Sequence, residues 1–129
     1  MFIVREGRLL VLHRRKRGAI YDAVPGGTIE EGETPRRTAE RELREETGIR
    51  VTLSAPVLVL ENQGRREFYF DAHQAEGDPV LGGPEAEKSN PSNHYALDWL
   101  SLTDLGTAPL KPDALKEWLL ARDWTRYPE

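Results

Sequence analysis

The order of strand-like and helix-like patterns along the chain predicts an α/β fold with a mixed sheet. Short apolar runs bounded by glycine and proline are typical of strands, and two amphipathic stretches are typical of helices. The length of 129 residues is enough for one domain with its own core and too small for two ordinary ones. We therefore expect residues 1–129 to form a single domain.

The N-terminal region is predicted to form a hairpin. Phe2 to Val4 and Leu9 to Leu12 are apolar, with a turn at Glu6-Gly7. The unbroken run at 9–12 indicates a strand buried on both faces. Because the chain begins almost inside its first strand, we expect either a start further upstream or a truncated strand. The basic cluster His13 to Arg17 is interpreted as a solvated loop at a strand end, or alternatively as a contact for an anionic substrate.

The remaining elements follow from the same patterns. A strand at 19–24 leads into the turn Pro25-Gly26-Gly27. The long irregular piece Glu76 to Asn93 is expected to be functional, because loops of this length are uncommon in compact domains. Trp124 and Tyr127 are expected to fold back on the core. The other predicted elements are strands at 28–30, 49–53, 57–60, 67–73 and 95–100, turns at 31–32 and 63–64, a helical turn at 101–105 and helices at 35–47 and 112–122.

The helix at 35–47 is specified at both ends. Thr34 is a favoured N-cap, Pro35 suits the first helical position, and Gly48 suits a left-handed C-cap. Ala39 and Leu43 form its apolar sector, next to the acids described below. The opposite sector is expected to be solvated and consists of Arg36, Glu40, Arg44 and Thr47.

Three acids, Glu42, Glu45 and Glu46, share one sector of this helix. At about 100° per residue the sector is roughly 100° wide. Like charges at these spacings repel one another, each pair by a few tenths of a kcal/mol. One interpretation is an ordinary charged, soluble helix face that includes an Arg41–Glu45 pair. The alternative is that the acids surround a bound cation. The glycine turn and Glu33 before the helix favour the second interpretation.

These residues also form a longer pattern that resembles the Nudix box. The pattern is Gly, five residues, Glu, seven residues, Arg-Glu-apolar, one residue, Glu-Glu, one residue, Gly-apolar. No fixed position departs from it. The residues that match are Gly27, Glu33, Arg41, Glu42, Leu43, Glu45, Glu46, Gly48 and Ile49.

The resemblance implies a fold and a chemistry. The fold would be a Nudix-like α/β/α sandwich with a mixed β-sheet. The activity would be metal-dependent hydrolysis of a pyrophosphate bond by water. Glu45 and Glu46 would be the principal metal ligands, joined by the Gly26 carbonyl, and Glu42 would be either a further ligand or the base. Arg41 would orient these glutamates, and Glu33 would support the loop or a metal.

Oxygen-only ligands favour Mg²⁺ or Mn²⁺ over Zn²⁺, and the chain has no cysteine. Nudix enzymes often take the general base from a later loop. Glu85 is the preferred candidate here, because it directly follows the Gly82-Gly83-Pro84 turn, and Glu87 is the second candidate. The alternative for both is a solvated loop acid. We expect the loop at 76–93 to close over bound substrate.

Other residues carry weaker signals. His13, His73 and His94 are isolated in sequence and are interpreted as surface or packing residues. Asn93 and Tyr95 could contact a base or ribose, or could simply end the loop and start a strand.

The composition limits the partners. A net charge of −4 implies no general affinity for nucleic acid, and no stretch is apolar enough for a membrane span or resembles a signal peptide. A cytoplasmic location and a monomer or homodimer are expected. The substrate is predicted to be a small nucleotide, a nucleoside diphosphate linked to another group. The alternatives are a pool-sanitising nucleoside triphosphate pyrophosphohydrolase and, from another class, a non-catalytic nucleotide sensor.

Overall fold

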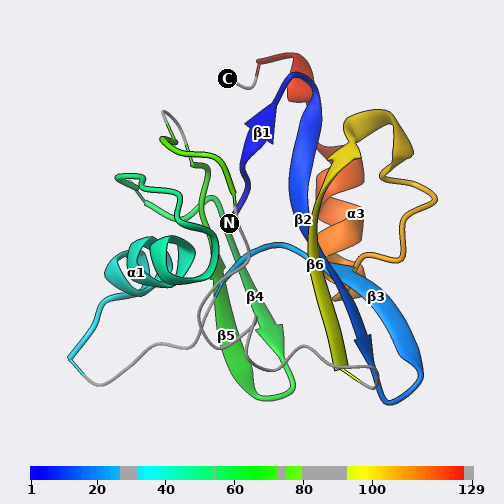
Figure 1. Ribbon diagram of the computed structural model, residues 1–129, viewed down its shortest axis with the longest axis horizontal. Helices are drawn as coiled ribbons and strands as arrows, with labels where there is room; N and C mark the ends of the chain where they lie inside the picture. The colour runs from blue at the N-terminus through cyan, green and yellow to red at the C-terminus, as the bar shows by residue number, and fades with distance from the viewer. Residues whose placement is uncertain (27–31, 54, 73–74, 80–92, 127–129) are drawn as a thin grey trace.

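The computed structural model describes residues 1–26, 32–53, 55–72, 75–79 and 93–126. These residues form six strands, two α-helices and two short 3₁₀ turns (Figure 1). The strands are β1 (Val4–Arg5), β2 (Arg8–Lys16), β3 (Ala19–Ala23), β4 (Leu58–Asn62), β5 (Arg65–Tyr69) and β6 (Asn93–Ser101). The helices are α1 (Pro35–Thr47) and α3 (Asp113–Ala121), and the 3₁₀ turns are η1 (Leu102–Asp104) and η2 (Trp124–Arg126).

Strand β2 organises the larger sheet. Antiparallel β6 pairs with it from Arg8 to Lys16, while β1 and β3 pair in succession with its other edge. Strands β4 and β5 form a separate antiparallel hairpin. The chain after β5 runs parallel to the N-terminal segment, and the Phe2 N–H donates to the Phe70 carbonyl at 2.8 Å. This parallel contact joins the β4–β5 hairpin to the larger sheet. The strands as a whole therefore combine parallel and antiparallel pairing.

Three tight turns set the register of these strands. Each has two residues, and the second is glycine: 6–7, 17–18 and 63–64. Both residues of each turn have positive φ, as in Glu6 (52°) and Gly7 (73°). Turns of this conformation match the twist of antiparallel strands, and glycine adopts their second position without strain.

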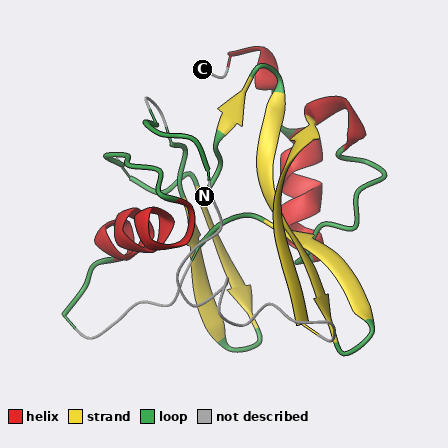
Figure 2. Cartoon of the chain, viewed as in Figure 1, coloured by secondary structure: helices red, strands yellow, loops and turns green. Residues whose placement is uncertain are grey.

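Two apolar cores lie on opposite faces of the strands. Leu9 and Val11 of β2 face the α3 side, whereas Leu10, between them, faces the α1 side. Leu115 and Leu119 of α3 complete the first core, and Leu43 of α1 belongs to the second. Figure 2 shows the two helices on opposite sides of the strands. The predicted α/β/α sandwich is therefore confirmed.

Several sequence predictions need correction. Strand β2 continues through His13 to Lys16, so four residues of the basic cluster lie in a strand and only Arg17 lies in a turn. Residues 49–53 form no strand, because only Arg50 makes an isolated bridge, to Glu76. Strand β5 ends at Tyr69, and residues 70–72 make only an isolated bridge, at Asp71, while His73 lies outside the described residues. Thr47 was expected to be solvated but is buried.

Most of the other predicted elements agree with the structure. The first hairpin, the strand after the basic cluster, the helix at 35–47, the turn at 63–64 and the C-terminal helix are present. Strand β6 is longer than predicted by two residues at its start and one at its end. Trp124 packs against the core on the α3 side, and its indole N–H donates to the Leu119 carbonyl. The predicted strand at 28–30 and the packing of Tyr127 lie outside the described residues.

Candidate active site

Helix α1 carries the acidic sector, and local interactions fix both of its ends. The Thr34 hydroxyl accepts from the Arg37 N–H at 3.2 Å, and Pro35 occupies the first turn. At the other end Gly48, with φ of 78°, donates to the Arg44 carbonyl at 2.9 Å. These interactions account for the agreement between the predicted and observed helix bounds.

The buried side of α1 orients the acidic sector. Leu43 lies in the core, and the buried Thr47 hydroxyl donates to the Leu43 carbonyl at 2.7 Å. Thr47 then accepts from the Ile49 N–H, which ties the helix end to the next segment. Glu40 is also held, because its carboxylate accepts from the Leu53 N–H at 3.1 Å. With these contacts fixed, the rotation of α1 is set.

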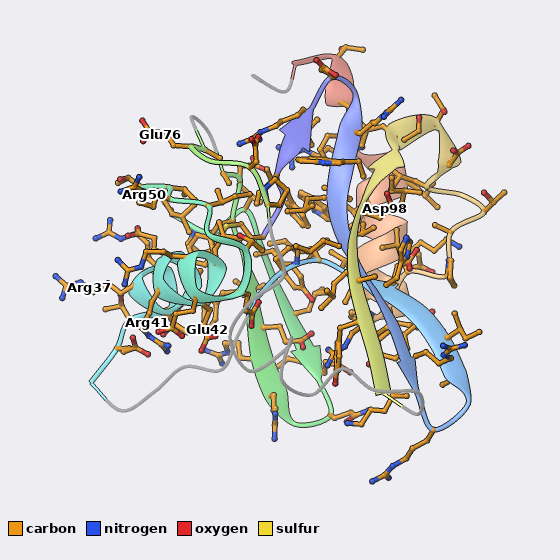
Figure 3. The ribbon with its side chains drawn as sticks, viewed as in Figure 1. Arg37, Arg41, Glu42, Arg50, Glu76 and Asp98 are labelled. Carbon is orange, nitrogen blue, oxygen red and sulfur yellow. The ribbon has the colours of Figure 1, made fainter. Side chains whose placement is uncertain are left out.

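Arg41 lies among three of the glutamates of the box. Its guanidinium donates to both carboxylate oxygens of Glu33, at 2.7 and 2.8 Å. The same group donates to Glu45 at 3.0 Å and lies 3.2 Å from a carboxylate oxygen of Glu42. The Thr38 hydroxyl donates a further bond to Glu33 at 3.2 Å. In Figure 3, Arg41 and Glu42 lie side by side along the lower side of α1.

The four carboxylates of this site differ in exposure. Glu45 is exposed, and Glu33 and Glu42 are half-buried, whereas Glu46 is only 7% exposed. A buried carboxylate is costly unless charge or hydrogen bonds compensate it. Arg41 can compensate only part of this concentrated negative charge. The site therefore favours additional positive charge.

The described residues contain no three acidic or histidine side chains that already converge on one point. Glu42 and Glu45 turn toward Arg41 instead. Gly26 follows β3 and is exposed, and the amino group of Met1 holds the preceding residue through a 2.8 Å bond to the Pro25 carbonyl. Gly27, Glu85 and Glu87 lie outside the described residues.

The sequence interpretation named Arg14, as part of the basic cluster, and Tyr95 as separate candidate substrate contacts, but it missed that they form one cluster with Tyr21. Arg14 of β2 pairs with Tyr21 on β3 and Tyr95 on β6, and its guanidinium lies 4.7 Å from the centre of the Tyr95 ring. Because Arg14 has the same strand parity as Leu10, this cluster is on the α1 side of the sheet. Extending the alternation of β2 through the basic cluster would have predicted this orientation.

A hollow of about 500 Å³ lies elsewhere on the molecule, beside the β1–β2 turn. Its two arginines face two carboxylates, so its charges balance and favour neither anions nor cations. It contains none of the residues of the box. Its lining consists of Arg5, Glu6, Arg8, Asp78, Pro79 and Trp99. Separately, no helix in the described part of the chain is long and apolar enough to cross a membrane.

Comparison with known proteins identifies the family. The model of the NUDIX domain matches residues 1–121, so the chain belongs to the Nudix family. This match confirms the resemblance drawn from the box and, for this domain, the predicted enzyme class of pyrophosphohydrolases. Nudix hydrolases act on small nucleotides and generally use divalent metal ions.

Individual relatives show the same likeness. A Bacillus subtilis protein named as a candidate 8-oxo-dGTP diphosphatase is 30% identical over 101 residues, which cover 78% of this chain and 63% of that protein. The chain thus spans less than two thirds of that relative's length. The crystal structure of a MutT Nudix hydrolase from Burkholderia pseudomallei has a TM-score of 0.72 at 29% identity, covering 95% of this chain and 93% of the other. The solution structure of the Escherichia coli ORF135 protein has a TM-score of 0.73 at 25% identity, covering 99% and 90%.

Proposed function

We propose that the chain is a Mg²⁺- or Mn²⁺-dependent hydrolase that cleaves a pyrophosphate bond in a nucleoside diphosphate linked to another group. The observation that carries this proposal is the acidic sector of α1, where Arg41 contacts Glu33, Glu42 and Glu45 and a fourth carboxylate of the box, Glu46, is buried. Among substrates of this class, nucleoside triphosphates are the first candidates. The name of the Bacillus subtilis relative favours them.

The donor set suits a hard divalent cation. Glu42, Glu45 and Glu46 offer only oxygen atoms, and the Gly26 carbonyl would add another. A divalent cation held there would neutralise the phosphate oxygens and lower the pKa of bound water. Such a cation would also supply the positive charge that this negative site favours.

The protein's own groups would divide the remaining work. Arg41, fixed by its two bonds to Glu33, would orient Glu45 so that it can bind the metal together with Glu46. Glu42 or a loop acid would accept the proton from the attacking water. On the α1 side of the larger sheet, Arg14, whose guanidinium lies against the buried Tyr95 ring, would bring its positive charge to an anionic substrate.

A substrate screen tests this function. The purified protein is incubated with nucleoside triphosphates, their oxidised forms, ADP-ribose and dinucleoside polyphosphates in Mg²⁺, and released phosphate or pyrophosphate is measured. We expect hydrolysis of at least one of these compounds. Nucleotide binding without any turnover would instead identify the non-catalytic sensor. The presence of every carboxylate of the box argues against that alternative.

Metal dependence gives the first prediction. We expect hydrolysis to require Mg²⁺ or Mn²⁺ and to stop when excess EDTA is added, because the carboxylates alone cannot neutralise a pyrophosphate. Activity measured before EDTA, after EDTA, and after restoring the metal checks it. Undiminished hydrolysis in EDTA would contradict the proposed mechanism, whatever the substrate.

The second prediction concerns the general base. We expect Glu85→Gln to lower kcat by roughly 10²–10⁴-fold, with little change in the concentration of Mg²⁺ needed for half-maximal rate. Glu87→Gln is the matched control, two residues away, and should retain activity. If a higher Mg²⁺ concentration partly restores the activity of Glu85→Gln, Glu85 is a metal ligand. If only Glu87→Gln loses activity, then Glu87 is the base, and if neither variant does, the base is not in this segment.

A further inference from the structure

The ring of His13 lies between two carboxylates on the α3 side of the larger sheet. Its Nδ1 contacts Oδ1 of Asp22 on β3, and its Nε2 lies 2.8 Å from Oδ2 of Asp98 on β6. His13 itself is on β2, the strand between them. One side chain thus links three adjacent strands. Asp22 is only 4% exposed, whereas the Asp98 side chain is 60% exposed.

The chemistry of this triplet determines its charge state. Ionised carboxylates only accept hydrogen bonds, and a neutral imidazole has a single N–H to donate. Both contacts can therefore be hydrogen bonds only if the ring is an imidazolium. Neutral His13 would leave one carboxylate facing a nitrogen lone pair. The two carboxylates lie on opposite sides of the ring, so they cannot bind one metal ion together.

Among the described residues, His13 is the cationic group that contacts Asp22. The backbone of Asp22 pairs with the 109–111 segment, through bonds to the Pro109 carbonyl and the Lys111 N–H. The Lys111 ammonium, however, is bonded to Asp113 at 2.8 Å. Around Asp98, the Trp99 N–H donates to Oδ1 at 2.8 Å, and the charge of Arg8 acts on the carboxylate from β2.

We propose that His13 is an imidazolium at neutral pH that clamps β3 and β6 onto β2 and thereby positions Arg14 between Tyr21 and Tyr95. Arg14 is the next residue of β2 and points to the opposite face, where its two aromatic neighbours come from the same two strands that His13 links. The consequence for substrate binding rests on the proposed function. His13 is a positioning residue and not a catalytic one.

The direction of the pH dependence follows from the contacts. Burial would lower the pKa of His13, but hydrogen bonds and charge from Asp98 and Asp22 outweigh it and raise the pKa above 6.5. A raised pKa in the folded protein means that the stabilisation is complete below 6.5 and is lost as the pH rises through the folded value. When His13 loses its proton, one of the two carboxylates loses its hydrogen bond. Since Asp22 is buried, we expect Asp98 on β6 to be the one that turns toward water.

Nuclear magnetic resonance of the histidine ring nitrogens tests the clamp directly. In wild-type protein we expect both nitrogens of His13 to be protonated at neutral pH and to titrate above 6.5. Asp98→Asn keeps the shape of the side chain but removes its charge, and should lower the pKa of His13. Asp104→Asn, an exposed change in η1, is the matched control and should leave it unchanged. A single protonated nitrogen at neutral pH, or no effect of Asp98→Asn, would overturn the proposal.

Kinetics and a second signal test the positioning role. With a substrate found in the screen, KM should rise as the pH increases through the pKa of His13. The value of kcat should show no change at that pH. Asp98→Asn should move the rise in KM to lower pH. The ring current of Tyr95 affects the chemical shift of the Arg14 Nε–H in the NMR spectrum. This chemical shift should change over the same pH range in which His13 titrates. If the clamp titrates but neither KM nor this signal follows, the positioning role is wrong. If no substrate turns over, the proposed function fails, and the Arg14 signal alone decides the positioning role.

Discussion

Glu46→Gln is expected to lower kcat by about 10²-fold or more while the protein stays folded. Glu46 is the buried carboxylate of the acidic sector on α1. Glutamine has nearly the same shape, but it lacks the negative charge that would hold a divalent cation, and that cation would neutralise charge on the reacting phosphate. The loss of one such electrostatic contact typically costs a few kcal/mol of transition-state stabilisation. Steady-state kinetics at saturating substrate and thermal unfolding of the same preparation check the result.

Glu40→Gln is the matched control for this experiment. Glu40 lies on the same helix, and its glutamine variant can still accept the hydrogen bond from the Leu53 N–H. We expect its activity to match that of the wild type. Removing one of several mutually repelling acids should leave the melting temperature of Glu46→Gln in metal-free buffer unchanged or higher. A loss of both activity and melting temperature would mean that Glu46 is a structural residue and not a ligand.

The helix that carries the candidate site was largely predictable because its signals are local. Thr34, Pro35 and Gly48 fix the ends of α1 through contacts within a few residues, so the sequence alone determines where the helix starts and stops. Once the helix is known, the 3.6-residue period places the acids on one side. The Arg41–Glu33 contact spans only eight residues and joins the loop to the helix.

The parts that could not be predicted depend on contacts between distant segments. Asp98 is 85 residues from His13, and nothing near either residue indicates that they meet. The charge of the basic cluster favours a loop, yet pairing with β3 on one side and β6 on the other keeps residues 13–16 in a strand. Residues 49–53 show the converse. All of them except Arg50 are β-branched or apolar, but Ile49 and Leu53 are buried without strand pairing, so burial accounts for the apolar character of these two.

Arg122→Met is expected to give the largest loss of stability. Arg122 follows α3 and donates to both oxygens of Asp71, at 2.7 and 2.6 Å, and their side chains are only 20% and 9% exposed. Removing the cation leaves a buried carboxylate without its partner, which typically costs about 3–5 kcal/mol. The guanidinium also lies against the rings of Trp118 and Trp124, so those contacts are lost as well. Denaturant unfolding, with the free energy extrapolated to water, measures the change.

An exposed ion pair provides the control for this variant. Arg66 and Glu61 lie 3.3 Å apart with side chains 66% and 69% exposed, and Arg66→Met should change the unfolding free energy by about 1 kcal/mol or less. Equal effects of the two variants would show that the buried pair adds nothing beyond an ordinary surface contact. Asp71→Asn combined with Arg122→Met should cost less than the sum of the single changes, because the double variant leaves no unpaired charge.

The position of Asp71 explains why this loss should affect the fold more than the chemistry. Asp71 lies between Phe70 and Ala72, whose backbones pair with Phe2 where the β4–β5 hairpin meets the N-terminal segment. Arg122 therefore ties the end of α3 to the contact that joins the two sheets. The hydrogen bonds that join Arg41 to Glu33 and Glu45 do not involve this pair. Below its lowered melting temperature, Arg122→Met should retain a kcat close to that of the wild type, in contrast to Glu46→Gln, whose loss is confined to catalysis.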